Sequence, residues 1–471
     1  MTPEEFRKFG HQMIDWIADY RATVDDLPVM STIQPGDVRK SLPSKPPESA
    51  ESFDAILADL NEKILPGITH WNHPNYFAYF PSNATLASVL GDLMSSGLGG
   101  IGLNWQSMPA LTELEELTTD WLRQMVGLST AWEGVIQDTA STSTLVALLC
   151  AREQSSNYSQ MNTGFQGQQS PFIVYSSIQS HSSVKKAALL AGFGLDHLRF
   201  IETDEHFALN IKCLEDAIQK DISAGFTPCA IIATTGTTTT TAIDPIADIA
   251  HLAKTHDMWL HVDAAMAGSA MILPECRWMW DGIEGADSLV LNPHKWLGVI
   301  FDCSLFYTRK SEHLVRVMST NPSYLQTSAD GEAKNYRDWG IPLGRRFRAL
   351  KLWCLIREQG VSGLQARIRR DMDNAQWLYQ QIEATPEWDI LAPVSLQTIC
   401  VRHIPAGLEA AELDVHTLNW VHEINSSGAA YLTPAKLNGQ WMVRISIGAE
   451  TTTLEHVQAL WDTMQNVVTS H

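Results

Sequence analysis

The sequence predicts an α/β fold: a large domain on a largely parallel sheet, with a helical arm before it and a small α+β domain after it. Helical and strand patterns alternate between about residues 85 and 355. After about residue 360, a long polar-faced helix precedes two β-like runs. The chain has 471 residues, 45% of them hydrophobic, which is enough for a sizeable core. The expected domains are residues 1–84, 85–358 and 359–471.

The first expected element is an amphipathic helix at the N-terminus. Thr2 can cap it, Pro3 suits the first helical position, and Glu5 completes a capping box. Apolar residues then recur at spacings of three and four from Phe6 to Val24, before a proline-rich stretch. A one-sided helix on an extended arm needs another surface for its apolar stripe, which either a second subunit or its own domain could supply.

The large domain should contain a helix over residues 111–125, which ends before Gly127. Five apolar runs predict strands at residues 172–175, 230–234, 259–262, 288–291 and 304–307. Helix-length segments separate several of them, which implies crossover connections and parallel pairing. In the C-terminal domain, a helix over about 363–384 precedes strands at 398–403 and 441–447, with another helix between the strands.

Charge and cysteine content exclude several classes of protein. With 53 acidic and 33 basic residues, the net charge of −20 disfavours nucleic-acid binding and a polybasic membrane anchor. No apolar run approaches the roughly 20 residues that span a bilayer, and the N-terminus lacks the apolar core of a signal peptide. The seven cysteines are scattered without a C-x-x-C pair, so neither a disulfide framework nor a zinc site is expected. We expect a cytoplasmic protein without a metal.

Residues 97–102 match G-x-G-x-x-G, the dinucleotide-binding fingerprint. That fingerprint requires a strand, a tight turn and a helix in this order. Here a helix-like stretch at 86–94 precedes the glycines, and Pro109 is expected to interrupt the helix that should follow. Close helix packing explains the glycines better than a nicotinamide site.

A hydroxyl-rich segment begins the helix that follows residue 139. Hydroxyl residues stand at positions 139 and 141–144, directly before an apolar stretch. Free N–H groups, hydroxyls and the positive helix end could together bind a phosphate. The same residues could equally be an ordinary helix cap with spare hydroxyls. Both interpretations are open from the residues alone.

Two charged residues follow predicted strands. Asp263 stands where one apolar run ends, and Lys295 stands just past another, between His294 and Trp296. Ligands of open α/β sheets bind outside the carboxyl ends of the strands, and a buried ion pair there is a weak source of stability. A desolvated lysine suits imine formation, because only the neutral amine attacks a carbonyl. A carboxylate can keep a pyridinium nitrogen protonated. With a phosphate cradle, these are the fixtures of a pyridoxal-phosphate site.

The motifs around these positions resemble the group II pyridoxal-phosphate-dependent amino-acid decarboxylases, in particular the aromatic-L-amino-acid (DOPA) decarboxylases. His-Val-Asp-Ala-Ala at 261–265 and Asn-Pro-His-Lys-Trp at 292–296 carry the resemblance. Further ordered matches lie at 73–82, 134–137, 181–184, 236–238 and 341–348, with bacterial DOPA decarboxylases looking closest. The resemblance implies a fold-type I enzyme with a seven-stranded sheet, and a homodimer whose active site lies between subunits.

The resemblance also implies roles at the cofactor. Lys295 would bind the aldehyde of pyridoxal phosphate, Asp263 its pyridine nitrogen, and His181 would stack on its ring. Ala140, Ser141 and Asn292 would hold the phosphate, while Thr139, Thr238 and His294 would line the site. Tyr324, on a mobile loop, would protonate the substrate carbon after carbon dioxide leaves.

The implied substrate pocket is rich in aromatic residues. It comprises Trp71, Tyr79, Phe80, Pro81, Ser82, His181 and Gly344, with Ile101 and Leu103 supplied by the partner subunit. Ser82 stands where the family commonly has Thr, and Met266 where it often has Tyr. Gly344 stands where histidine-selective relatives tend to carry Ser, which favours rings larger than imidazole.

The expected reaction is decarboxylation of aromatic L-amino acids to amines, with L-DOPA first and 5-hydroxytryptophan, tryptophan and tyrosine as further substrates. The alternative is an aldehyde synthase that couples decarboxylation to oxidative deamination. Tyr324 and His181 count against it, because relatives with that activity often replace one of them. A catalytically dead homologue would lack Lys295 or Asp263, and an aminotransferase would lack the loop tyrosine.

Overall fold

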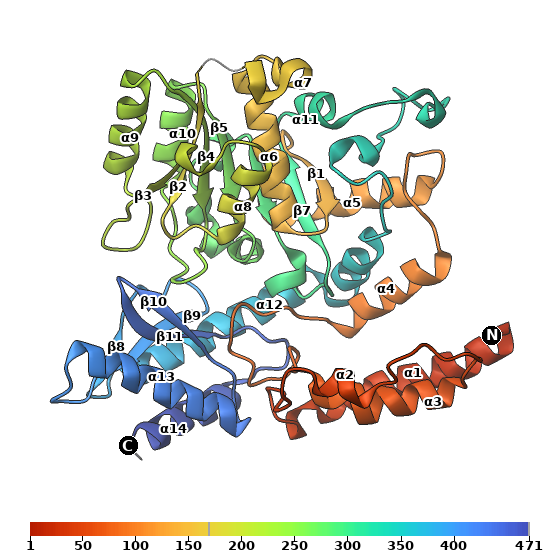
Figure 1. Cartoon of the computed structure of the whole chain (residues 1–471), viewed down its shortest axis with the longest axis vertical. Coiled ribbons are helices and arrows are strands. Elements are labelled where there is room, and N and C mark those ends of the chain that lie inside the picture. Colours follow the sequence, from red (N-terminus) through yellow and green to blue (C-terminus); the bar gives the residue numbers. More distant parts are fainter. Residues whose placement is uncertain (168–169, 470–471) are drawn as a thin grey trace. The chain divides into compact units, whose positions relative to one another are not determined.

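The computed structural model describes residues 1–167 and 170–469, which form two compact units (Figure 1). The first unit comprises Met1–Pro81, Asn374–Leu391 and the chain from Ile399 onward; the second comprises Ser82–Asp373 and Ala392–Thr398. The expected domain boundaries after residues 84 and 358 stay a prediction. Among the described residues, no helix is both long enough and apolar enough to cross a membrane.

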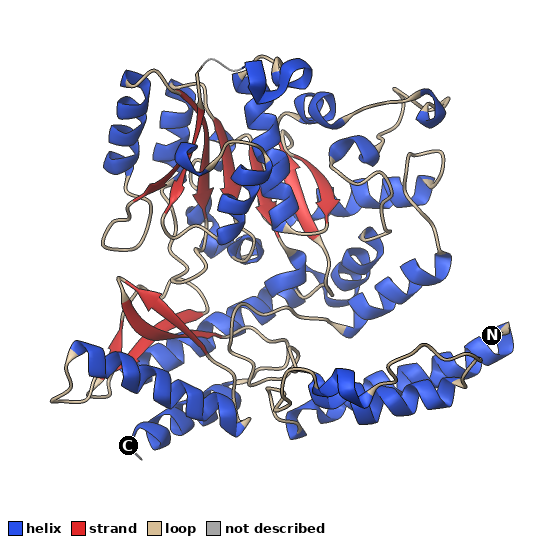
Figure 2. Cartoon of the chain, in the orientation of Figure 1, coloured by secondary structure: helices blue, strands red, loops and turns tan. Residues whose placement is uncertain are grey.

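The second unit is built on a seven-stranded sheet (Figure 2). Its strand order is β1-β7-β6-β5-β4-β2-β3. The strands are β1 (Glu133–Gln137), β2 (Phe172–Ser177), β3 (Leu198–Ile201), β4 (Thr227–Thr234), β5 (Trp259–Asp263), β6 (Ser288–Leu291) and β7 (Ser304–Thr308). Among these described strands, β7 pairs antiparallel with both β1 and β6, and all other pairs are parallel. The predicted largely parallel, seven-stranded sheet is therefore confirmed.

Helices of the second unit connect and cover these strands. They are α4 (Leu86–Leu98), α5 (Pro109–Met125), α6 (Ala140–Ser155), α7 (Gln160–Thr163), α8 (Ser182–Leu190), α9 (Ile211–Ser223), α10 (Ile246–Thr255) and α11 (Ser311–Met318). Residues of α6 such as Val146 and Leu148 pack against Val174, Ile232 and Phe306 of the strands, and this packing forms the central core. Strands buried in this way read as continuous apolar runs, which is why the sequence reveals most of them.

The glycines at 97–102 follow α4 rather than a strand, as expected. Pro109, however, does not interrupt a helix. It is the first residue of α5, a position where the missing N–H costs nothing. The long helix α12 (Ala349–Glu383) extends further than its predicted range and is kinked at Gly360, whose φ is +63°.

The first unit contains the N-terminal helices α1 (Pro3–Thr23), α2 (Asp37–Ser41) and α3 (Phe53–Asp59). The predicted capping box is present, since Glu5 N–H donates to Thr2 Oγ1 at 3.2 Å and Thr2 N–H donates to a Glu5 carboxylate oxygen at 2.7 Å. Phe9 contacts Phe53 of α3, with ring centroids 4.8 Å apart. Part of the apolar stripe therefore packs within this chain.

A four-stranded sheet of order β10-β11-β9-β8 completes the C-terminal part. Its strands are β8 (Trp388–Ile390), β9 (Thr398–His403), β10 (Thr433–Leu437) and β11 (Gln440–Ser446). Helices α13 (Ala410–Ser427) and α14 (Leu454–Thr469) accompany it. This agrees with the small α+β domain expected after the polar-faced helix.

Candidate active site

The helix α6 begins directly after β1, with Thr139 at its N-cap in an extended conformation. Within the described residues, the Thr139 side chain caps none of the helix N–H groups. Its own N–H instead donates to Asp138 Oδ1 at 2.6 Å. The first N–H groups of the helix, at Ala140 and Ser141, therefore remain for an anion. This supports a phosphate-binding site at the start of α6 rather than an ordinary helix cap.

Asp263 is the last residue of β5 and lies beside the end of β4, where Thr234 is its register partner. The residue is only 5% exposed, and its Oδ1 accepts a hydrogen bond from Ala265 N–H at 3.0 Å. The hydroxyls of Thr234 and Thr235 are buried at the same sheet edge without a partner among the described residues. The edge thus carries a fixed carboxylate and polar atoms that a ligand can satisfy.

Lys295 lies on a short turn, Pro293–Leu297, that follows β6. Its backbone leaves the helical region (φ −100°, ψ −111°), and its N–H donates to Asn292 O at 3.0 Å. Asn292 is buried, and its side-chain oxygen has no partner within the described chain. Leaving such an atom unpaired costs about 1–3 kcal/mol. A bound group that completes its bonding would offset this cost.

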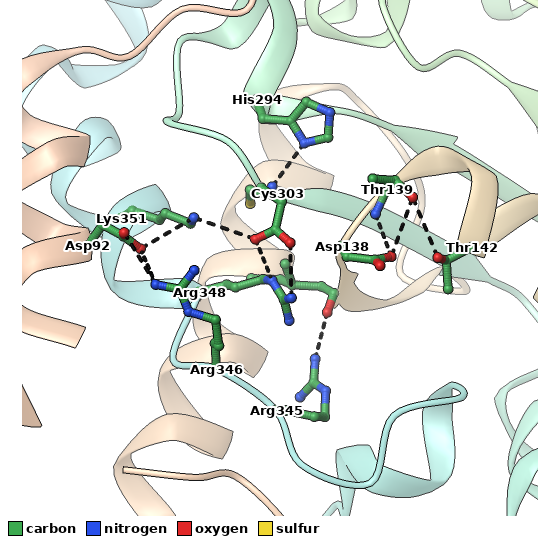
Figure 3. A network of polar contacts seen from close by, with 12 residues as sticks. Asp92, Asp138, Thr139, Thr142, His294, Cys303, Arg345, Arg346, Arg348 and Lys351 are labelled. Carbon is green, nitrogen blue, oxygen red and sulfur yellow. Dashed lines mark hydrogen bonds and ion pairs between the residues drawn. The ribbon is translucent and has the colours of Figure 1, made fainter. Parts of the chain in front are cut away.

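His294, next to Lys295, is held by the backbone of Cys303 (Figure 3). The Cys303 N–H donates to His294 Nδ1 at 2.9 Å, and His294 N–H donates to Cys303 O at 3.2 Å. Burial, together with the charge of Lys295, lowers the pKa of His294 to about 3. The imidazole is therefore neutral, and because Nδ1 accepts, its proton is on Nε2.

A charged network supports this turn (Figure 3). The Asp302 carboxylate accepts hydrogen bonds from Arg348 Nε and Nη2 at 3.0 and 3.1 Å. The buried ammonium of Lys351 lies 3.4 Å from Asp92 and 3.8 Å from Asp302. Arg346 also pairs with Asp92, at 3.1 Å. The network joins α4 and α12 to the residue that precedes Cys303.

His181 is the N-cap of α8, and its Nδ1 accepts from Ser183 N–H at 3.2 Å. Loss of hydration lowers the pKa of His181; the charge of Asp263 opposes this shift and that of Lys295 adds to it. His181 is therefore within electrostatic reach of both residues. Its neutral ring again carries the proton on Nε2.

Thr238 lies half-buried in the turn after β4. The turn depends on Gly236, whose φ is +81° and where a Cβ would lie 2.6 Å from Ala267 Cβ. The N–H groups of Gly236 and Thr237 both donate to Ala242 O at 3.0 Å. The uncapped helix, the edge carboxylate and the lysine turn of the second unit fit pyridoxal phosphate.

Five of the predicted substrate residues, counting His181, lie in the second unit. The Ser82 hydroxyl donates to His294 O at 3.4 Å, so it adjoins the lysine turn. A Cβ at Gly344 would lie 3.4 Å from Ile101 Cγ2 and 4.0 Å from Leu103 Cδ2. Gly344 therefore contacts the segment of Ile101 and Leu103 within one chain.

The position of Gly344 is fixed by its neighbour Arg345. This buried guanidinium lies 2.6 Å from Glu115 Oε1 and donates to Ile136 O at 2.7 Å. The Arg345 carbonyl accepts from Gly102 N–H at 2.9 Å.

The remaining predicted pocket residues, Trp71, Tyr79, Phe80 and Pro81, lie in the first unit. Trp71 and Tyr79 stack with centroids 5.9 Å apart, and the Arg444 guanidinium lies 4.1 Å from the Phe80 ring. Tyr431 Oη donates to Tyr79 Oη at 3.3 Å. No motif in the sequence marks Arg444 or Tyr431. Each contacts an aromatic residue about 350 positions earlier in the chain, and only folding brings them together.

The structure places two further positions that the motifs single out. Tyr324, on the short turn Ser323–Leu325, is 77% exposed, so the single chain leaves the proposed proton donor in solvent. Met266 is buried, and its Sδ accepts from Gln397 Nε2 at 3.3 Å. This contact accommodates the thioether at a position where the resembling family often has Tyr.

Comparison with known proteins agrees with this geometry. Residues 35–404 match the pyridoxal-dependent decarboxylase conserved domain. Phenylacetaldehyde synthase of Arabidopsis thaliana is 39% identical over 475 residues, which cover 99% of this chain and 96% of the relative. Tyrosine decarboxylase 2 of Narcissus pseudonarcissus is 38% identical, with 100% and 95% covered. The crystal structure of Oryza sativa TDC with PLP and tryptamine has a TM-score of 0.97 at 34% identity, with 100% and 99% covered. These relatives are plant proteins, not the bacterial enzymes that the motifs suggest.

Proposed function

The chain belongs to the pyridoxal-dependent decarboxylase family, and from this we propose that it converts aromatic L-amino acids to amines and carbon dioxide. The observation that carries the proposal is that Asp263, Lys295 and His181 stand at or just beyond the carboxyl ends of the parallel strands β5, β6 and β2 of one sheet. The aromatic relatives support the substrate class. L-DOPA is the first substrate to test, followed by 5-hydroxytryptophan, tryptophan and tyrosine.

Each residue at the cofactor site would have its own role in the reaction. When bound, pyridoxal phosphate supplies the sink for the electron pair that remains as carbon dioxide leaves. Lys295 would bind its aldehyde carbon, and Asp263 would hold a proton at its pyridine nitrogen. Ala140 and Ser141 would donate their N–H groups to its phosphate.

Two side chains would then act around the reacting carbon. The His181 ring would cover one face of the cofactor ring and exclude water from it. Tyr324 would donate its phenolic proton to the substrate Cα, provided that its loop closes over the site.

The preference for large rings rests on Gly344. Because Gly344 has no side chain, the position 3.4 Å from Ile101 Cγ2 and 4.0 Å from Leu103 Cδ2 carries no Cβ. One such position changes substrate preference by about 1–3 kcal/mol. Several aromatic substrates should therefore be accepted, with histidine disfavoured.

An aromatic aldehyde synthase is the second candidate. A relative with 39% identity is a phenylacetaldehyde synthase, which favours this candidate. Retained Tyr324 and His181 favour the amine product instead.

We further propose a homodimer in a reducing, cytoplasmic compartment. Helix α4 exposes Leu86, Leu90, Leu93, Met94 and Leu98, an apolar face that a second copy would cover. All seven cysteines lie in described residues, and none of them forms a disulfide. Free thiols suit a reducing compartment.

Product analysis tests the proposed reaction. The protein with pyridoxal phosphate is given L-DOPA, 5-hydroxytryptophan, tryptophan, tyrosine, phenylalanine, histidine and glutamate, and carbon dioxide, amine, aldehyde and peroxide are quantified. Equal amounts of amine and carbon dioxide from aromatic substrates are expected. Aldehyde with peroxide would select the synthase, and no product from any aromatic substrate would refute both. Lys295→Ala should abolish turnover, and robust decarboxylation by it would remove Lys295 from its role.

A further inference from the structure

The loop that carries Tyr324 spans residues 319–335, between α11 and the turn Tyr336–Trp339 (Figure 1). A hollow of about 610 Å³ adjoins it, lined by the loop residues Asp330, Lys334 and Asn335 and by Ser311 and Val315 of α11. The loop is thus not close-packed on this side. Leu325 is buried and its carbonyl accepts from Arg337 Nη1 at 2.9 Å, whereas the residues from Asp330 onward are held on this side by polar contacts.

One contact fixes the C-terminal end of the loop to the sheet. Lys334 Nζ lies 2.7 Å from Glu133 Oε2, at the start of β1. The Ser311 hydroxyl donates to the other oxygen of the same carboxylate. Glu133 therefore holds residue 334 in place beside α11.

Asn335 makes a different connection. Its side-chain oxygen accepts from Trp105 N–H at 2.9 Å, and its Nδ2 donates to Asp330 Oδ1 at 2.9 Å. Asp330 also accepts from Thr327 N–H at 3.2 Å, which closes residues 327–335 into a turn. The Asn335 amide thus joins the loop to the segment between α4 and α5. Its oxygen makes the contact to that segment, and its NH₂ group makes the contact within the loop.

The segment to which Asn335 is hydrogen-bonded also carries Ile101 and Leu103. Gly102 N–H of this segment bonds to Arg345 O at 2.9 Å, beside Gly344. A continuous path therefore runs from the Tyr324 loop through Asn335 and Trp105 to the space beside Gly344.

We propose that Asn335 is a positioning residue that keeps the Tyr324 loop in register with the 101–107 segment during the reaction. The inference rests on the proposed function, because it acts through protonation by Tyr324. Without Asn335 the loop detaches more often, and the carbon from which carbon dioxide has left meets oxygen before it meets a proton. The side reaction consumes one amino acid, one O₂ and one water, and yields aldehyde, carbon dioxide, ammonia and hydrogen peroxide.

The test compares Asn335→Leu with Gln326→Leu, which removes an amide from the same loop. In the part of the chain that the structure describes, Gln326 Nε2 donates only to the loop carbonyl of Asn321, at 3.4 Å, so Gln326→Leu controls for general loop damage. The first readout is the rate of limited proteolysis within 319–335 in the protein without substrate. Asn335→Leu should be cleaved about fivefold faster than wild type, the factor expected for one net hydrogen bond. Gln326→Leu should be cleaved at the wild-type rate.

The second readout is the aldehyde-to-amine ratio in air, with Tyr324→Phe as reference. Asn335→Leu should raise the ratio, and the double variant with Tyr324→Phe should match Tyr324→Phe alone, because both act through one group. Asn335→Asp, which keeps the acceptor for Trp105 but repels Asp330, should also raise the ratio.

Three outcomes are decisive. A raised ratio in Tyr324→Phe with an unchanged ratio in both Asn335 variants overturns the inference alone. Unchanged proteolysis in both Asn335 variants overturns it as well, whatever the products. If wild type forms no product from any aromatic substrate, the proposed function fails, and proteolysis still decides whether Asn335 holds the loop.

Discussion

His261 and His294 show how burial fixes the protonation of single residues near the lysine. His261 is fully buried on β5, two positions before Asp263, and its Nδ1 lies 2.9 Å from Ser288 Oγ. Burial lowers the pKa of His261 to about 4 and that of His294 to about 3. Both rings are therefore neutral at the pH where Asp263 and Lys295 would act.

These pKa values predict acid sensitivity. A histidine with a lowered pKa binds its proton more readily in the unfolded chain, so the stabilisation present above pH 6.5 is lost as pH falls towards the folded-state pKa. Between about pH 6.5 and 4, His261→Asn should reduce the slope of unfolding free energy against pH by about one proton. Denaturant titrations across this window measure the slope. A slope identical to that of wild type would contradict the assignment.

The residues that were predictable from sequence share one physical property. Asp263 ends one apolar strand and Lys295 lies on the turn that follows another, so a local pattern reveals both charged residues. Asn335 and Arg444 act through contacts to residues far away in the chain, and only folding brings those partners together.

At the scale of elements, the lysine turn depends on helices on either side of it. In this network the Lys351 side chain is 1% exposed and that of Asp302 18% exposed, whereas the Arg346 side chain at its other end is 49% exposed. A buried charge that loses its partner is costly, while an exposed pair contributes little.

This contrast predicts two unequal effects. Asp302→Asn should lower the free energy of unfolding by about 3 kcal/mol, because the buried Lys351 ammonium and the largely buried Arg348 guanidinium both lose this carboxylate. Arg346→Ala should lower it by less than about 1 kcal/mol. Chemical denaturation of both variants with bound pyridoxal phosphate provides the comparison. Equal losses of unfolding free energy in the two variants would contradict the argument that burial determines how much each ion pair contributes.

Strands differed in how well the sequence revealed them. Five buried strands of the large sheet are continuous apolar runs and were predicted. β1 begins with Glu133 and Gly134, and β3 is only four residues long with Arg199 inside it, so neither forms such a run. The resemblance to a known family, rather than the pattern itself, supplied the count of seven strands.

At the scale of the whole molecule, the apolar face of α4 is the strongest indication of a partner copy. Leu90 is 50% exposed in the middle of that face. In a twofold dimer each substitution is present twice at the interface. The same surface would bring Ile101 and Leu103 to the site of the other subunit.

Leu90→Asp should therefore convert the proposed dimer to a monomer and remove the proposed decarboxylation with it. Light scattering after size-exclusion chromatography gives the mass, and product assays give the activity. Leu190→Asp, at the 65% exposed end of α8, is the matched control and should stay dimeric and active. A dimeric Leu90→Asp would place the interface elsewhere.

The buried thiols of Cys229 and Cys303 can report how the protein opens. Burial raises the pKa of Cys229, in β4, and of Cys303, which clamps His294, to about 12, so almost no reactive thiolate exists at neutral pH. A maleimide reaches either sulfur only when the surrounding structure separates. Labelling at Cys303 therefore times the opening of the lysine turn, and labelling at Cys229 times the opening of the sheet. The two labelling rates can be compared in one protein. Faster labelling at Cys303 than at Cys229 would show that the lysine turn opens before the sheet does.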